Sequence, residues 1–126
     1  MGTTIRVKRI YDEASPADGF RVLVDRLWPR GISKAAAQID LWAKDWTPSN
    51  DLRKWFHQNL SQVDEFAKRY RTELLENIDE VESTINSLKC HDVVTLVTST
   101  KDIAAGHAAV LKEFLVARWP TRDSKG

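Results

Sequence analysis

The chain has 126 residues, of which 42% are hydrophobic and 29% charged, and its formal net charge is +1. This length predicts one domain with a real core, and the near-neutral charge argues against a dedicated nucleic-acid binder. The sequence has one cysteine, no signal-peptide pattern and no apolar run near the ~20 residues of a membrane span, which together favour a reducing cytoplasm.

The first third of the chain predicts two strands and a short helix. Residues 5–10 alternate apolar and basic side chains, which is typical of a strand with one face in water. A polar loop over residues 12–19 leads to a second, apolar strand over residues 20–27. Ser33 is predicted to cap a short helix over residues 34–38. The segment 39–45 that follows is expected to be extended.

Helices dominate the middle of the chain. Ser49 is predicted to cap a helix that carries Leu52, Trp55 and Phe56 on one face. A weaker capping signature begins at Ser61. It opens a long helical region that forms either one helix or two helices broken near residues 76 and 77.

The last third predicts a buried strand over residues 92–98 and a helix over residues 103–118. This order of elements predicts the α/β class: a single compact domain over residues 1–120 with a small, mostly parallel sheet flanked by helices. The polar residues 121–126 are predicted to form a disordered tail. The lone Cys90 is interpreted as a buried filler.

Polar side chains follow two of the predicted strands. One group ends the second strand: Asp25, Arg26, Trp28 and Arg30. The other group follows the last strand: Thr100, Lys101 and Asp102, with His107 a little further on. Ligands of open α/β sheets bind at the carboxyl ends of the strands, and helix N-termini attract anions. Both groups are therefore predicted to line one cleft for an anion.

The charged residues of this cleft have two readings. Arg26 and Arg30 suit a bidentate grip on a phosphate or carboxylate, with Lys44 and Lys101 as further charge clamps. In the alternative reading, Asp25 pairs with one arginine and the group only locks the loop. Asp25 is a candidate catalytic residue beside His107, but an orienting role is preferred over that of a general base, because nearby cations lower its pKa. Asp102 is expected to have the same orienting role.

Aromatic and histidine side chains also have alternatives. Trp28 and Trp42 each have two readings, as a planar wall for the ligand or as part of the core. Trp46 and Trp55 are predicted to be core residues. His107 is the preferred proton carrier if a reaction occurs, and otherwise a packing or capping residue. The other histidines, His57 and His91, are read as surface residues. No metal-ligand spacing and no nucleotide-cofactor glycine motif occurs, so no metal and no cofactor is predicted.

Four segments together resemble one protein family. They read DGFRVLVDRLWPRGISK, LWAKDWTPSNDLRKWF, FAKRYRTEL and VVTLVTSTKD, with His107 downstream. In this order they resemble the YeaO-like bacterial proteins, a domain of unknown function (family 488). The resemblance covers nearly the whole chain, and DRLWPRG is its most specific motif. It implies a compact cytoplasmic α/β domain with no established activity.

The resemblance also implies a recurring polar set, which adds Lys34 to the candidate ligand-binding residues. The set as it stands here is Asp25, Arg26, Trp28, Arg30, Gly31, Lys34, Trp42, Lys44, Arg53, Tyr70, Lys101, Asp102 and His107. Two positions depart from the family pattern: Thr98 stands where relatives usually have tyrosine, and Gly106 where they have asparagine. If those side chains orient a ligand elsewhere, binding in this chain is weakened, altered or lost.

The leading hypothesis is a cytoplasmic protein that binds a small anion, phosphate-bearing or nucleotide-like, at the strand ends. An alternative is a non-catalytic interaction module that uses the same basic loop on a protein or, less favoured, on nucleic acid. A third reading is purely structural, with all the charges satisfied inside the protein. No membrane partner is predicted, and neither a reaction nor an oligomeric state follows from the sequence.

Overall fold

The computed structural model describes residues 2–101 and 106–120, and its centre is a four-stranded parallel sheet in the order β1-β4-β2-β3. The strands are β1 (Thr4–Arg9), β2 (Phe20–Leu23), β3 (Leu41–Trp42) and β4 (Val93–Thr98). β4 pairs with β1 on one side and with β2 on the other, always in parallel. The predicted α/β class with a small parallel sheet is confirmed.

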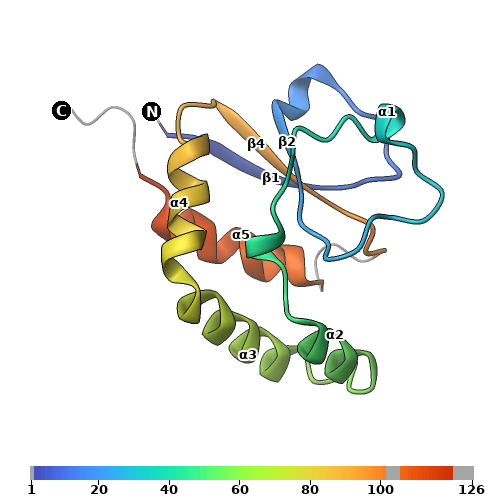
Figure 1. Cartoon of the computed structure of the whole chain (residues 1–126), viewed down its shortest axis with the longest axis vertical. Helices are drawn as coiled ribbons and strands as arrows, with labels where there is room; N and C mark the ends of the chain where they lie inside the picture. The colour runs from blue at the N-terminus through green and yellow to red at the C-terminus, as the bar shows by residue number, and fades with distance from the viewer. Residues whose placement is uncertain (1, 102–105, 121–126) are drawn as a thin grey trace.

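Five α-helices and two short 3-10 segments complete the described part of the chain. The helices are α1 (Lys34–Ala37), α2 (Asn50–His57), α3 (Val63–Glu76), α4 (Ile78–Leu88) and α5 (His107–Arg118), and the 3-10 segments are η1 (Pro16–Asp18) and η2 (Lys44–Trp46). Figure 1 shows the sheet in the upper half, α4 and α5 beside it, and α2 with α3 below. No helix within residues 2–101 and 106–120 has the length and apolar character needed to cross a membrane.

Alternation along the strands sends apolar side chains to both faces of the sheet. Val22 and Leu96 point into the main core, which lies under α3, α4 and α5 and contains the fully buried Trp46 and Tyr70. Leu23 and Val97 point to a smaller cluster covered by the segment around α1. The sheet therefore has helices on one face and mostly loop on the other.

Local capping chemistry sets several of the helix starts. The Ser33 and Ser49 side chains accept hydrogen bonds from the backbone N–H groups of Ala36 and Leu52, as predicted. The long helical region is two helices, because the chain breaks at Asn77 between α3 and α4. Ser61 is not the cap of α3, since Gln62 precedes the helix and makes no side-chain capping bond.

Three further predictions differ from the structure. The regular part of β2 ends at Leu23, because the chain turns away after Val24 to begin the charged loop. Cys90 is exposed rather than buried, since it lies in the turn between α4 and β4. Trp55 is only half-buried, with the Arg69 guanidinium 4.1 Å from its ring centroid. The predicted helix start at 103–105 and the predicted tail over 121–126 lie outside the described residues.

A buried ion pair closes the amino-terminal end of the sheet. The buried Arg21 guanidinium donates to Asp18 at 2.6 Å and to the Ala37 carbonyl at 2.8 and 3.1 Å. Lys8 approaches the same carboxylate at 3.0 Å. Burial alone raises the pKa of Asp18, but the hydrogen bonds from Lys8, the Ser15 backbone and Arg21 outweigh it and hold the pKa below the usual value. This cluster is a structural lock and lies away from the carboxyl ends of the strands.

Candidate functional site

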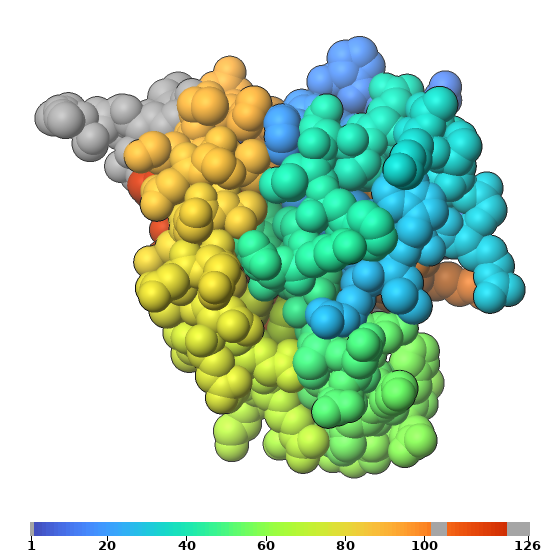
Figure 2. Space-filling view, viewed as in Figure 1, coloured from blue at the N-terminus to red at the C-terminus, as the bar shows by residue number. Residues whose placement is uncertain are grey.

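The carboxyl ends of β2 and β4 lie side by side, and the loops that leave them form one wall of a cleft. Its volume is about 580 Å³. The opposite wall is α2 and the turn into α3. Figure 2 shows α2 in green, below the blue and cyan segments that follow β2. The lining residues are Tyr11, Asp25, Arg26, Leu27, Trp28, Pro29, Arg30, Pro48, Arg53, Phe56, His57, Leu60, Phe66, Ser99, Thr100, Gly106 and His107.

Asp25 joins three elements at the floor of this cleft. One carboxylate oxygen accepts from the Thr98 hydroxyl at 2.6 Å and lies 3.3 Å from Nε2 of His107. The other oxygen accepts from the Ser99 backbone N–H at 2.8 Å and from the Ser99 hydroxyl at 2.7 Å. The carboxylate thus ties the end of β2 to the end of β4 and to the first residue of α5.

These partners also keep Asp25 ionised. Its burial alone raises the pKa of the carboxyl group, but hydrogen bonds from His107, Thr98 and the Ser99 backbone outweigh that effect and hold the pKa below its usual value. The predicted direction of the shift is confirmed, although hydroxyls, an N–H group and a histidine produce it rather than the arginines. Thr98, one of the two departures from the family pattern, is therefore a direct partner of Asp25.

His107 is half-buried at the start of α5, and its ring is held by the backbone of the loop. Its Nε2 lies 2.8 Å from the Val24 carbonyl oxygen. Because a carbonyl oxygen only accepts hydrogen bonds, Nε2 carries a hydrogen in this arrangement. The ring also packs edge-on against Tyr70, whose hydroxyl donates to the Trp46 carbonyl. Burial, followed by the charges of Glu73 and Asp25, raises the pKa of Tyr70 well above its usual value.

Three arginines face the cleft. Arg26 is half-buried, its Nη1 donates to the Thr47 hydroxyl at 3.3 Å, and it also lines a neighbouring cavity that contains Thr47 and Lys44. Arg53 is also half-buried and donates to the Asn50 side chain at 3.1 Å. Arg30 is exposed, and its guanidinium makes no hydrogen bond to the described residues. The predicted pair Arg26 and Arg30 therefore shares this cleft with an arginine from α2.

The two candidate wall tryptophans have different positions. The Trp28 indole N–H donates to the Ile32 carbonyl at 2.7 Å, and the ring lines the cleft. The Trp42 indole N–H donates to the Asp25 carbonyl at 2.7 Å, and Lys44 lies 4.3 Å from its ring centroid. Trp42 is not part of the described cleft lining, so its structural role is to hold the charged loop.

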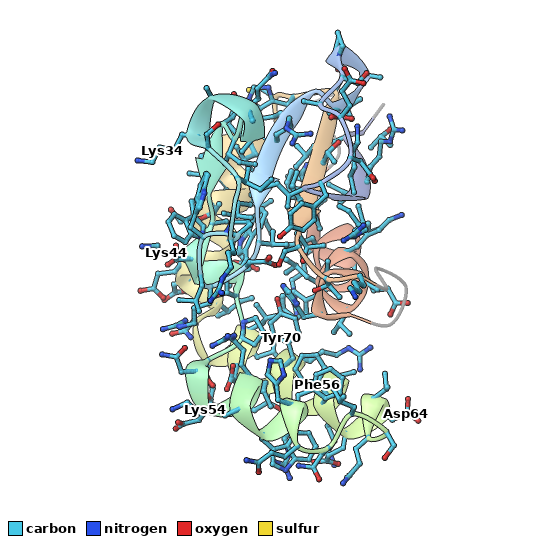
Figure 3. The ribbon with its side chains drawn as sticks, turned by 90° about the vertical axis from the view of Figure 1, so that its right-hand side faces the viewer. Lys34, Lys44, Lys54, Phe56, Asp64 and Tyr70 are labelled. Carbon is cyan, nitrogen blue, oxygen red and sulfur yellow. The ribbon has the colours of Figure 1, made fainter. Side chains whose placement is uncertain are left out.

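Four other predicted ligand-binding residues are not among the described residues that line this cleft: Lys34, Lys44, Lys101 and Asp102. Figure 3 shows Lys34 and Lys44 on the left of the molecule, both above Phe56. Lys44 follows β3 and lines a separate cavity, because η2 turns it away from the strand ends. Lys101 is exposed and is not among the described lining residues, whereas Asp102 lies outside the described residues. Thr100 does line the cleft.

Of the α2 wall, only Arg53 belongs to the polar set that the family resemblance implies, and no position in the cleft was predicted for it. Arg53, Phe56, His57 and Leu60 all line the cleft, and Phe56 stacks on Phe66 with ring centroids 4.1 Å apart. The helical spacing of Phe56 predicted a buried face but not which surface that face meets. His57 was read as a surface residue and is indeed exposed, yet it borders the cleft. No group of acidic, histidine and cysteine side chains in the described parts could hold a metal ion.

The fold and the cleft define a small parallel α/β domain with a basic, aromatic-lined cleft at the carboxyl ends of its strands. The chain belongs to the family described as "Inactive DUF488-N3 subclade", which it matches over residues 4–126. This finding confirms the predicted family resemblance.

Two curated bacterial relatives cover almost the same length. The chain is 45% identical over 116 residues to Uncharacterized protein Rv3073c of Mycobacterium tuberculosis, which is 92% of this chain and 97% of the relative. It is 41% identical over 111 residues to Uncharacterized protein YeaO of Escherichia coli, which is 88% of this chain and 96% of the relative. No solved structure gives a significant match.

Proposed function

We propose that this protein binds a small phosphate-bearing anion in the cleft at the ends of β2 and β4, without catalysing its conversion. The observation that carries the proposal is the set of three arginines, Arg26, Arg30 and Arg53, around one cavity. Asp25 is the one acidic side chain among the described lining residues, and both of its carboxylate oxygens already accept hydrogen bonds within the protein. The cleft therefore presents more positive charge than the protein itself neutralises.

A comparison inside the molecule supports a ligand rather than a structural lock. Arg21, the structural arginine, is buried and donates to a carboxylate and a carbonyl. Arg30 is exposed and has none of these bonds among the described residues. A planar guanidinium with unoccupied donors suits bidentate recognition of phosphate.

Binding without catalysis is favoured by the state of the two candidate catalytic groups. Asp25 is ionised with its lone pairs occupied, which makes it a poor general base. His107 uses Nε2 for the Val24 carbonyl. The word "inactive" in the family description points the same way. We further propose a cytoplasmic location, on the basis of the single cysteine and the predicted reducing environment.

Calorimetric titration with phosphate, pyrophosphate and a nucleoside monophosphate at low salt tests the proposal. Arg30→Lys keeps the charge but removes the fork, and is expected to weaken binding about tenfold, or ~1.4 kcal/mol. Arg71→Lys is the matched control, because Arg71 is an exposed arginine of α3 that lies near Glu113 and outside the cleft. A wild-type protein with no affinity tighter than about 1 mM for any of these anions refutes the proposal and favours the interaction module.

A further inference from the structure

Exposed apolar side chains gather at the cleft. Three of the large hydrophobic residues with the highest exposure line it: Tyr11 at 46%, Leu27 at 62% and Leu60 at 63%. They come from three separate loops, after β1, after β2 and between α2 and α3. Outside the cleft, the described residues with comparable exposure are Leu75 and Val116. Grouped exposure of this kind marks a binding surface more often than single exposed side chains do.

The interior of the cleft continues this apolar surface. Phe56 and Pro48 line it from the α2 side, and Trp28 and Pro29 from the loop after β2. Figure 3 shows Phe56 between the lower helices and the part of the molecule that holds the sheet. Arginine donors and an apolar, aromatic surface thus face the same space.

The size of the cleft exceeds what a bare anion needs. Its volume of about 580 Å³ lies within the ~300–1,000 Å³ of typical small-molecule sites. Inorganic phosphate occupies only a few water volumes of ~30 Å³ each, and it gains nothing from an apolar wall because it is strongly hydrated. An organic phosphate fills the space and covers the exposed side chains.

Resting on the proposed function, we propose that the ligand is an organic phosphate whose second part is an apolar ring. The phosphate meets the guanidinium groups of Arg26 and Arg30, and the ring lies against Leu27, Leu60 and Phe56. The ring belongs to a nucleobase or to a simple aryl group, because both can present a flat aromatic face to this wall.

Four probes separate the two halves of the ligand. Phosphate carries only the head, phenol only the ring, phenyl phosphate both, and adenosine monophosphate a nucleobase in place of the phenyl ring. Phenyl phosphate is expected to bind at least tenfold more tightly than phosphate, and phenol to bind weakly. A similar gain for adenosine monophosphate identifies the ring as a nucleobase, and a gain for phenyl phosphate alone identifies it as aryl.

Surface variants test the position of the ring. The double variant Leu27→Ser with Leu60→Ser is expected to abolish the advantage of phenyl phosphate while leaving the affinity for phosphate unchanged. Leu75→Ser is the matched control, since Leu75 is 49% exposed on α3 and does not line the cleft. Because these side chains are exposed, the serine variants are expected to keep the core intact, and thermal unfolding of each variant checks this.

The outcomes distinguish this inference from the function on which it rests. Equal affinity for phosphate and phenyl phosphate overturns the ring proposal and leaves anion binding intact. An advantage of phenyl phosphate that survives in the double variant also overturns it. Absence of binding by every phosphate-bearing probe overturns the proposed function itself.

Discussion

Asp25→Asn is the substitution that most directly tests how the ends of the strands are held together. Asparagine keeps the shape of the side chain but removes its charge and replaces one acceptor oxygen with an NH₂ donor. The Ser99 backbone N–H cannot reverse its role, so the asparagine oxygen must stay on that side. The new NH₂ group then faces the Thr98 hydroxyl and Nε2 of His107.

The expected cost follows from the bonds that change. Three hydrogen bonds to the carboxylate, at 2.6, 2.7 and 2.8 Å, lose their charge assistance. A hydrogen bond to a charged group contributes ~1.5–3 kcal/mol, against ~0.5–1.5 kcal/mol for a neutral one. The Thr98 hydroxyl can rotate to accept from the new NH₂ group, which limits the damage there. We expect Asp25→Asn to lower the free energy of unfolding by about 2–3 kcal/mol.

Urea denaturation at about pH 7 measures this difference, with an unchanged slope showing that the same surface unfolds. The pKa of Asp25 is lowered in the folded protein, so its contribution is fully present above the usual value of 3.8. That contribution disappears as the pH falls through the lowered folded value, because a protonated Asp25 resembles asparagine. The gap between wild type and variant therefore narrows only in acid below about pH 4.

Two results contradict this reasoning about Asp25. One is a loss below ~0.5 kcal/mol near neutral pH, which places the variant among ordinary surface substitutions. The other is a gap that stays constant from neutral pH into strong acid, which means that the charge of Asp25 contributes nothing. Asp12→Asn is the control, since Asp12 is an exposed aspartate in the loop after β1.

Four further substitutions test the core and the close approaches. Gly19→Ala should destabilise the fold by about 2–4 kcal/mol in urea titration, because Gly19 has φ +63° and a Cβ there would lie 2.4 Å from the Val93 carbonyl oxygen. Trp46→Ala should cost ~3–5 kcal/mol and Trp55→Ala clearly less, since Trp46 is fully buried and Trp55 is not; equal losses would contradict the assignment of the core. Tyr70→Phe should lower the free energy of unfolding, measured in urea, by ~1–3 kcal/mol, because it leaves the buried Trp46 carbonyl without the Tyr70 hydroxyl as donor. An unchanged free energy of unfolding would show that this hydrogen bond does not stabilise the fold.

Local chemistry accounts for the parts of the fold that the sequence predicted well. Ser33 and Ser49 cap their helices because a side-chain oxygen satisfies an N–H group only three residues away. The sequence left open whether the long helical region is one helix or two, because its apolar positions keep helical spacing throughout; the structure breaks it at Asn77. Ser61 is not the cap, because α3 begins two residues later, at Val63, and the residue at its N-cap, Gln62, makes no side-chain capping bond.

Tertiary contacts account for what the sequence could not specify at the candidate site. Arg53 and Leu60 reach the cleft only because α2 and the start of α3 pack below the strand ends. Lys44 lies two residues after Trp42, whose indole bonds the loop after β2. The η2 segment nevertheless places Lys44 in a different cavity. Asp25 was expected to orient arginines. Its carboxylate instead contacts Thr98, Ser99 and His107, which lie more than 70 positions away in the chain.

The position of β4 affects how a nascent chain can fold. In the described sheet β1 has β4 as its neighbour, and the pairing joins Thr4 to Val93. β1 is therefore synthesised first and stays unpaired until β4, near the end of the chain, has left the ribosome. Pairing between such distant segments slows folding, and an unpaired strand edge invites association with other chains. A chain cut short before Val93 should aggregate, and β1 is the segment that a chaperone would protect longest.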